Sequence, residues 1–432
     1  MKFKNFFLFI AILFLFYAVY LSAEPLQFDE WFFIAKPVSG MQRYPAVAYA
    51  KNVYLVVWQE GYYGWGPPAD TGIKGGRISD AGRIIDNESF IISNAQDFQE
   101  RPVIATDGEM FLVVWQDFRN GKDYDIYAAR VTTEGKILDI DGIPITKARS
   151  NQCNPSVAFD GKNFVVAWMD NRDIEQSYHI RASRVGTNGV VFDSEGITVA
   201  GYDEKNLKGL MQSNNLKGLS LNSFPKIACS KGDCLIGWIS KTQPWKESPA
   251  FRHIITEPEI KLNSGTITIP SSDALEDSRA GSPEISIAAN GNKYMAVYSG
   301  IQGKGSGSYF IIGVFFDGMK NAKNNITPLK IRPWKEGYKL STHVVPYNKG
   351  FVVIWAEGYN VKGEEHIKFT MKGISIDKNN QTEEFEVFPL NDSYRGYAFL
   401  FMGSRHGLLV YEEIDKNDGM RIIGRIMRLK EQ

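Results

Sequence analysis

Acidic side chains recur at one fixed position of the sequence, two residues after an aromatic residue that ends an apolar run. The five acids are Glu60, Asp117, Asp170, Glu357 and Glu413. Twice an arginine follows, giving Asp117-Phe118-Arg119 and Asp170-Asn171-Arg172. Catalysis needs one asymmetric set of groups, so a repeated acid favours a structural role. We expect these carboxylates to bond arginine or turn groups and to shape a loop.

Asp117, Asp123 and Asp125 could also gather around a calcium ion, because carboxylates are among its preferred ligands. Their spacing lacks the EF-hand pattern, which speaks against such a site. The three cysteines and five histidines show no zinc-site spacing either. We therefore expect no metal and no cofactor.

Several aromatic residues fall in predicted connections between strands, where they are candidates for ligand binding. They are Tyr62, Tyr63, Trp65, Trp245 and Trp334. In the predicted fold these connections open on one face, together with the long insertion 201–222. Aromatic rings on such loops anchor sugar faces or protein partners. The sequence thus suggests a glycan or protein partner at this face, and it leaves open that the rings pack against their own loops.

Seven apolar runs that end in an aromatic residue organise the chain. The aromatic residues are Trp58, Trp115, Trp168, Trp238, Tyr298, Trp355 and Tyr411, spaced 53 to 70 residues apart. In four copies a proline stands thirteen residues earlier, at Pro45, Pro102, Pro155 and Pro225. Each proline opens a short alternating strand, where its missing N–H does least damage. A turn such as Asp107-Gly108 then leads into the aromatic-ended strand, as in a hairpin.

Two further strands complete each clear copy. An arginine marks the third strand, with a glycine five residues later and an aspartate nine residues later, as at Arg77, Gly82 and Asp86. A short fourth strand begins at Phe90, Ile143 and Ile197. Four antiparallel strands in roughly 50 to 60 residues are typical of a β-propeller blade. The sequence predicts an all-β, seven-bladed propeller whose large aromatic residues are buried as wedges between blades.

The last copy reaches Gln432 without a fourth strand. Near the N-terminus, Asp29 precedes Phe33 by four residues, the same offset that places Phe90 after Asp86. We therefore expect residues 26–36 to supply the missing strand of the seventh blade and to remove an exposed sheet edge. The alternative is a disordered N-terminal arm.

Cys229 and Cys234 flank the hairpin turn Ser230-Lys231-Gly232-Asp233. This placement favours a cross-strand structural disulfide over a redox pair, and export would permit it. Cys153 would then stay single.

The N-terminus has the form of a secretory signal, with Lys2 and Lys4 before 18 uncharged residues, 6–23. The same run could span a bilayer as an uncleaved anchor. In either case we expect an exported chain, periplasmic or extracellular, with a signal peptide or anchor over 1–23 and one propeller domain over 24–432. Membrane association is expected only if residues 6–23 are retained. The balance of 49 basic and 49 acidic residues speaks against nucleic-acid binding.

The stretch from Asn154 to Asp193, and its neighbour from Arg101 to Asp139, resemble repeats of secreted bacterial and archaeal β-propeller proteins. The resemblance is strong in blades one to three. It is weaker in blades four to seven, where the arginine and glycine marks largely disappear. The resemblance implies a propeller and leaves the activity open, because propellers include binding modules, lyases and glycosidases.

The sequence is therefore compatible with two functions. The leading prediction is a non-enzymatic recognition or scaffold module that binds a glycan or protein partner through one loop face. The alternative is a carbohydrate-active propeller enzyme of the sialidase or glycosidase kind.

A sialidase-like site needs an arginine cluster, a tyrosine nucleophile backed by glutamate and usually SxDxGxxW turns. Arg101-Pro102-Val103 only loosely resembles the arginine motif, and the sequence contains no such turn. A glycosidase needs two carboxylates at a defined separation, and the many acids of the chain leave that open. We lean away from catalysis and predict no catalytic residue.

Overall fold

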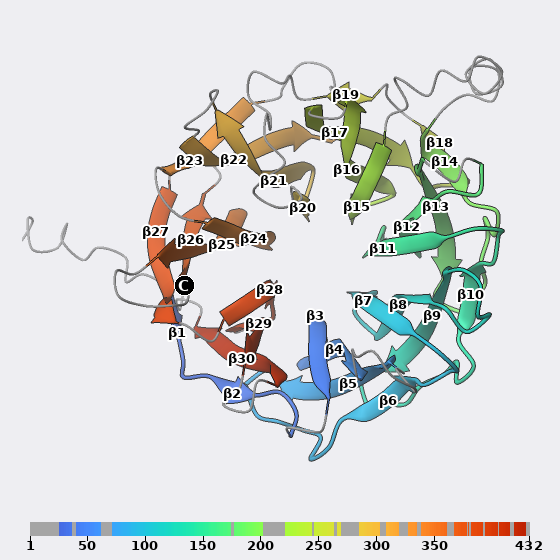
Figure 1. The fold of residues 1–432 in the computed structure, drawn as a ribbon, viewed down its shortest axis with the longest axis horizontal. Coiled ribbons are helices and arrows are strands. Elements are labelled where there is room, and N and C mark those ends of the chain that lie inside the picture. The colour runs from blue at the N-terminus through green and yellow to red at the C-terminus, as the bar shows by residue number, and fades with distance from the viewer. Residues whose placement is uncertain are drawn as a thin grey trace, which may run out of the picture.

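The computed structural model of the chain describes residues 26–36, 40–61, 71–173, 177–201, 221–243, 246–262, 266–268, 285–302, 308–318, 327–334, 338–360, 367–377, 379, 382–391, 394–404, 406–414 and 419–428. The predicted signal segment, residues 1–23, lies outside these ranges. The described residues form strands, bridges and turns. Seven antiparallel sheets stand in a ring as blades (Figure 1), which confirms the predicted seven-bladed propeller. No helix in this described part of the chain is long and apolar enough to cross a membrane.

The blades follow one another along the chain. Blade 1 holds β3 (Met41–Ala50), β4 (Val53–Gly61), β5 (Thr71–Ser79) and β6 (Phe90–Ser93). Blade 2 holds β7 (Gln99–Thr106), β8 (Met110–Asp117), β9 (Asp125–Thr132) and β10 (Ile143–Thr146). Blade 3 holds β11 (Gln152–Phe159), β12 (Asn163–Asp170), β13 (His179–Gly186) and β14 (Ile197–Ala200). The predicted fourth strands therefore begin where the repeat places them.

The remaining blades keep the same order with small variations. Blade 4 holds β15 (Leu221–Ser230), β16 (Asp233–Gln243) and β17 (Lys246–Ile255), with β18 (Lys261–Leu262) and β19 (Ile267–Thr268) both paired to β17. Blade 5 holds β20 (Ile285–Asn290), β21 (Lys293–Gln302), β22 (Ser308–Asp317) and β23 (Thr327–Trp334). Blade 6 holds β24 (Tyr338–Tyr347), β25 (Gly350–Asn360), β26 (Ile367–Ile376) and β27 (Thr382–Asn391). The first strand of each blade lies nearest the ring axis (Figure 1).

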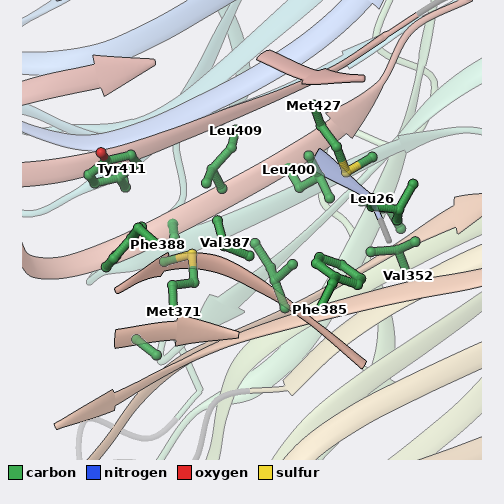
Figure 2. Packing of buried hydrophobic residues seen from close by; sticks show 14 of the residues in the cluster. Leu26, Val352, Met371, Phe385, Val387, Phe388, Leu400, Leu409, Tyr411 and Met427 are labelled. Atoms are coloured by element: carbon green, nitrogen blue, oxygen red, sulfur yellow. The ribbon is translucent and has the colours of Figure 1, made fainter. Parts of the chain in front are cut away.

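The seventh blade closes the ring with strands from both ends of the chain. It holds β28 (Tyr394–Met402), β29 (His406–Ile414) and β30 (Met420–Arg428). The short N-terminal strands β1 (Gln27–Phe28) and β2 (Phe32–Phe33) pair antiparallel with β30, as predicted for residues 26–36. Leu26 enters the core beside Leu400 and Met427 (Figure 2).

A buried aromatic wedge on the second strand of each blade fills the space against the preceding blade. Trp115 of blade 2 packs with Leu55 and Val57 of blade 1, and Trp58 of blade 1 packs with Leu408 and Val410 of blade 7. All seven wedges are at most 2% exposed. Removing such a ring from water contributes about 4–6 kcal/mol gross as an upper limit. These contacts explain why the repeat tolerates change elsewhere and keeps its aromatic residue.

The repeated acid accepts a hydrogen bond from the indole of the wedge. The Nε1–oxygen distances are 3.1 Å for Trp58–Glu60, 2.7 Å for Trp115–Asp117, 2.9 Å for Trp168–Asp170 and 2.7 Å for Trp355–Glu357. The expected arginine partners are also present, since Arg119 and Arg172 each bond their aspartate at 2.6 Å. A buried indole N–H without an acceptor would cost about 1–3 kcal/mol. The acid thus makes a polar ring compatible with the apolar interface.

A repeated arginine joins each of the first three blades to the next one. Arg77 forms an ion pair with Asp86 at 2.6 Å and donates from Nη1 to the Thr133 carbonyl of blade 2 at 3.1 Å. Arg130 reaches the Thr187 carbonyl of blade 3 at 3.2 Å, and Arg184 the Thr256 carbonyl of blade 4 at 3.1 Å. The arginine and aspartate of the repeat are therefore inter-blade contacts.

The glycine of the repeat makes room for that arginine. Gly135 has φ +85°, and a Cβ there would lie 3.1 Å from Arg77 Nε. Glycine is thus required at position 135 for two reasons: the backbone has a left-handed φ, and a Cβ would crowd the neighbouring guanidinium.

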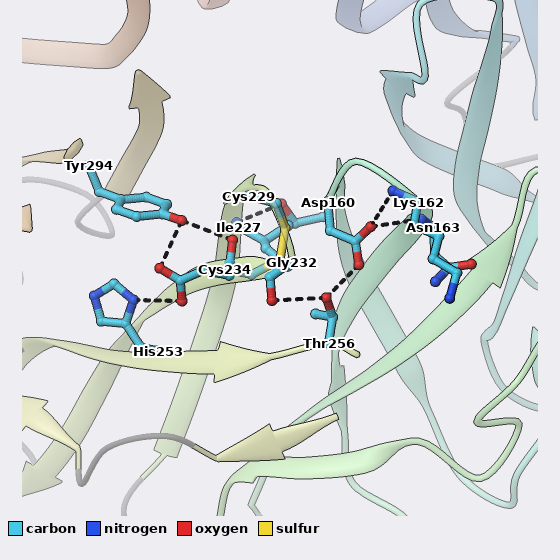
Figure 3. The surroundings of a disulfide bond; sticks show 12 residues. Asp160, Lys162, Asn163, Ile227, Cys229, Gly232, Cys234, His253, Thr256 and Tyr294 are labelled. Atoms are coloured by element: carbon cyan, nitrogen blue, oxygen red, sulfur yellow. Dashed lines mark hydrogen bonds and ion pairs between the residues drawn. A yellow bond between two sulfur atoms is a disulfide. The ribbon is translucent and has the colours of Figure 1, made fainter. Parts of the chain in front are cut away.

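Cys229 and Cys234 form a disulfide across β15 and β16, the pairing expected at this hairpin (Figure 3). In the adjoining turn, Asp233 accepts a hydrogen bond from the Tyr294 hydroxyl of blade 5 at 3.1 Å. Thr256 of blade 4 donates to Asp160 of blade 3. The disulfide therefore stiffens a turn region that connects three blades.

We expect Gly135→Ala to destabilise the protein more than Gly108→Ala. Gly108 has φ +92° with open space around its Cβ position, so both variants meet the backbone cost of about 1 kcal/mol. Only Gly135→Ala must also displace Arg77, which adds roughly 1–2 kcal/mol. Urea-unfolding midpoints of the two variants check this, and equal losses would contradict the inter-blade role of the arginine.

Candidate functional site

A strained backbone position recurs at the start of the inner strands of blades 1 to 4. The residue before the repeat proline has a left-handed φ of 51° or 52° at Tyr44, Arg101, Asn154 and Phe224. The ladder between the first and second strands shifts register at the same place. Non-glycine residues adopt this conformation at a cost, and such strain is concentrated at functional sites.

Each strained residue donates its backbone N–H to the preceding blade. The acceptor is the side chain that follows the wedge: Glu412 Oε1 for Tyr44 at 2.6 Å, Gln59 Oε1 for Arg101 at 3.1 Å, Gln116 Oε1 for Asn154 at 3.0 Å and Met169 Sδ for Phe224 at 3.3 Å. The bulge is therefore held in place from the neighbouring blade.

Where blades 7, 1 and 2 meet, charged and aromatic side chains come together. We name this set the axial cluster, because most of its members lie on the inner strands of the ring: Arg43, Tyr44, Glu100, Arg101, Tyr124 and Glu412. The Arg101 guanidinium carbon lies 4.6 Å from the Tyr44 ring centroid, and that of Arg43 lies 4.9 Å from it. Tyr44 thus stacks with guanidinium groups from two blades.

Glu100 is held by several donors. Its carboxylate accepts hydrogen bonds from the Tyr124 hydroxyl at 2.8 Å, from Gln116 Nε2 at 3.1 Å and from Gln59 Nε2 at 3.4 Å. Burial, and then the nearby Glu100 charge, raise the pKa of Tyr124. Tyr124 is therefore a hydrogen-bond donor, and the Glu100 side chain is held in place by three donors.

Glu412 is the buried acid of the axial cluster. Its side chain is fully buried, and burial raises its pKa to about 7 although the Tyr44 N–H, Arg43 and Arg101 act in the opposite direction. Oε1 accepts the Tyr44 N–H, whereas Oε2 bonds no described residue and lies 3.9 Å from Arg43 Nε. Blades 1 and 2 have glutamine at the same position. Glu412 therefore changes charge near neutral pH where its equivalents cannot.

Cys153 borders the cluster in blade 3. Its thiol lies 3.6 Å from the Asn154 amide nitrogen. Burial raises its pKa to about 11, so the thiol stays protonated at neutral pH and is a poor nucleophile.

The predicted ligand-binding aromatics fall mostly outside the described residues, as Tyr62, Tyr63, Trp65 and Trp245 do. Only the backbone of Trp334 is described, at the end of β23 opposite Tyr309. The connection 62–70 leaves β4 at Gly61, which pairs with Met41, two residues before Arg43. The predicted loop of blade 1 therefore starts at the same end of the blade as the axial cluster.

The acidic loop of blade 2 is organised by an amide. Asn120 Nδ2 donates to Asp123 at 2.7 Å and to Asp125 at 3.1 Å. Burial and the charge of Asp123 raise the pKa of Asp125 to about 6. In the described part of the chain, no group of three or more His, Cys, Asp or Glu residues is placed to hold a metal ion.

The axial cluster was not among the sites predicted from the sequence. A signal was present, because the residues before the repeat proline differ among copies while the proline stays: Arg43-Tyr44-Pro45, Glu100-Arg101-Pro102, Cys153-Asn154-Pro155 and Ser223-Phe224-Pro225. A tripeptide that varies at its first two positions, and is charged in blades 1 and 2, marks a place in the repeat that is free of the packing constraint.

No protein-family model and no curated protein sequence matches this chain. Solved structures do resemble it. A protein of unknown function from Dyadobacter fermentans has a TM-score of 0.52 at 11% identity, covering 94% of this chain and 100% of that one. The polysaccharide lyase Uly1 has a TM-score of 0.52 at 9% identity, covering 89% and 90%. At these identities the similarity shows the propeller fold alone.

A carboxyl group with a raised pKa predicts a specific pH dependence of stability. The folded state retains the Glu412 proton that the unfolded chain releases above its ordinary pKa of 4.5. The stability that this retained proton provides is fully present below about pH 4.5 and is lost as the pH rises through about 7. Glu412→Gln keeps the hydrogen-bond acceptor and cannot ionise. Its free energy of unfolding should therefore exceed that of wild type by up to roughly 3 kcal/mol at pH 8 and by little at pH 4.5.

Urea unfolding at both pH values measures this difference. Glu386→Gln, at an exposed position on β27, is the matched control and should change nothing. A Glu412→Gln variant that is equally displaced from wild type at both pH values would show that Glu412 is not the titrating group.

Proposed function

We propose that the chain is an exported recognition propeller that binds a glycan at the end of the ring carrying the axial cluster. The observation that carries the proposal is the stack of Arg43, Tyr44 and Arg101 across two blades, at 4.9 and 4.6 Å. Planar guanidinium groups provide the hydrogen-bond donors that sugar hydroxyls accept from, and the Tyr44 ring holds the two groups in place. Both arginines and Tyr44 are only half-buried, so part of each remains accessible.

Binding without catalysis agrees with how the described acids are used. The repeated acids accept from wedge indoles and arginines, and Glu100 accepts from three donors. The fold similarity to a polysaccharide lyase is compatible with a glycan ligand. The aromatic residues predicted for the loops, led by Trp65, would extend the same surface.

One observation favours the enzymatic alternative. The Tyr124 hydroxyl bonds Glu100 at 2.8 Å beside Arg101, which is the combination of tyrosine, glutamate and arginine that a sialidase-like site would need. The raised pKa of Tyr124 works against a phenolate nucleophile, which is why we prefer recognition.

A glycan array probed with the full chain tests this proposal. We expect selective binding that weakens at least tenfold in Tyr44→Ala, which removes the ring that holds both guanidinium groups, and in Trp65→Ala, which removes a predicted sugar-stacking ring. Trp31→Ala is the matched control, since Trp31 is 55% exposed beside the closing strands on blade 7. Loss of binding in the control alone, or no glycan bound at all, would contradict the proposal.

The same ligands, incubated with the protein and analysed for cleavage products, separate the two functions. Product formation that Tyr124→Phe abolishes would replace recognition by catalysis. Unchanged ligands recovered after prolonged incubation are the result we expect.

A further inference from the structure

We infer that residues 6–23 stay attached as a membrane anchor and that the outer edges of blades 7 and 1 contact the lipid bilayer, with Ile84 and Ile85 in its interface. The partner is the lipid surface itself. In this orientation the axial cluster faces away from the membrane. The contact does not depend on what the axial cluster binds, so it goes beyond the proposed function.

The apolar segment 6–23 is longer than the apolar core of a cleavable signal. It holds 18 uncharged residues behind Lys2 and Lys4, whereas a signal core has about 7–15 residues. A membrane-spanning helix needs about 17–25. Signal cleavage also prefers small residues in an A-x-A-like pattern, and this chain has Leu21-Ser22-Ala23. These features favour a retained anchor.

The chain enters the propeller at the outer edge of blade 7, three residues after that segment. Leu26 is buried in the blade core, and Gln27 pairs with Arg428 at the end of β30. β1 and β2 lie on the perimeter of the ring (Figure 1). The three peptide links from Ala23 to Leu26 span at most about 11 Å. A retained anchor therefore keeps this edge of blade 7 close to the lipid headgroups.

The connection between β5 and β6 of blade 1 lies at the same end of the ring. β5 ends beside the β3–β4 hairpin, and β30 ends beside the β28–β29 hairpin, where Arg428 pairs with His406. The two hairpins touch, since the Tyr49 hydroxyl lies 2.7 Å from Ser404 Oγ. The point where the chain enters blade 7 and the β5–β6 connection therefore face the same way.

Ile84 and Ile85 lie in this connection, next to the N-terminal strands. Gly82 approaches blade 7 so closely that a Cβ on it would lie 2.5 Å from Ile426 Cγ1. The Ile426 carbonyl in turn accepts the N–H of Asp29 at 2.8 Å. Ile84 is 50% exposed and Ile85 41%. Two apolar side chains are thus exposed beside the entry of the chain.

The backbone fixes both side chains in this exposed position. Ile84 forms a β-bridge with Ile78, and the Ile85 N–H donates to the Arg77 carbonyl at 2.9 Å. The next residue, Asp86, forms the ion pair with Arg77 at 2.6 Å. A contact made by a preorganised segment loses little conformational freedom. The connection is therefore suited to a lasting contact with an apolar surface.

Charges of both signs surround the two isoleucines. Arg83 and Glu88 are exposed in the same connection, and Arg428 pairs with Asp29 at 2.6 Å. This mixture gives no net attraction to anionic headgroups, whereas buried apolar side chains bind the interface of any bilayer. We therefore expect the contact to form on neutral lipid and to persist at high salt.

The axial cluster lies at the opposite end of the inner strands. Arg43 stands near the start of β3, whereas the hairpin after Ala50 marks the end that faces the anchor. Seven residues of strand separate the two ends by roughly 20 Å. The proposed orientation therefore leaves the end with the axial cluster open to a large ligand.

The equivalent positions of blades 2 and 3 provide internal references. Leu138 and Phe192 precede the aspartate of the repeat as Ile85 does, and they are 37% and 51% exposed. Each lies one blade farther around the ring from the anchor. Contact with lipid should therefore decrease in the order Ile85, Leu138, Phe192.

Fluorescence quenching in phosphatidylcholine vesicles tests this order with the full chain. A fluorophore is attached to Ile85→Cys, Leu138→Cys or Phe192→Cys, and the vesicles carry a lipid-bound quencher. The label at 85 should be quenched at least threefold more than one on Lys122→Cys, an exposed position at the opposite end of blade 2. The chain without an added cysteine gives the background, and the mass of the N-terminal peptide shows whether residues 6–23 are retained.

A second substitution tests the isoleucine contact itself. Ile84→Asp should lower the quenching of the label at 85 at least twofold, because a carboxylate is excluded from the apolar interface. Val190→Asp, at an exposed apolar position of blade 3, is the matched control and should leave it unchanged. An unfolding midpoint for each variant verifies that it folds.

Four results would overturn the inference. A mature chain that begins after Ala23 removes the anchor. Equal quenching at 85 and 122, or strongest quenching at 192, removes the assigned surface. Quenching that requires anionic lipid or disappears at high salt removes the apolar contact. A label at 85 that is shielded without lipid quenching in a dimeric chain shows that a second copy covers this edge. None of these results bears on glycan binding, which the array measures separately.

Discussion

Each blade can bury its second strand only between two neighbours, and this constraint requires the ring to close. The wedge at Trp58 shows the requirement most clearly, because it packs on Leu408 and Val410 at the other end of the chain. β1 and β2 form the outer edge of blade 7, so the first and last strands of the propeller lie in one sheet. Without this closure the first wedge and the last blade would both expose apolar surface.

The same closure assembles the candidate site. Glu412 belongs to blade 7, Tyr44 to blade 1 and Arg101 to blade 2, and the hydrogen bond from the Tyr44 N–H to Glu412 crosses the seam of the ring. The left-handed bulge before the proline is maintained by that contact and in turn presents the neighbouring side chains. Packing of blades and chemistry of the site thus depend on one interface.

The sequence predicted the fold well because burial of large rings leaves a visible pattern. Trp115, Trp168 and Trp355 recur at blade spacing, and the outer strands begin at Phe90, Ile143 and Ile197 as expected. The roles of the repeat acid and glycine were less accessible, since Asp117 bonds an indole and Gly135 packs on an arginine of another blade. The axial cluster was missed because Glu412 and Tyr44 are 368 residues apart and meet only through closure.

Amide hydrogen exchange across the seam reports directly on closure of the ring. If residues 26–34 complete blade 7, their amides and those of β30 should be protected together and should exchange in one cooperative event, with β3 on the other side of the seam. Rapid exchange of residues 26–34 while β30 stays protected would contradict ring closure and the site that depends on it.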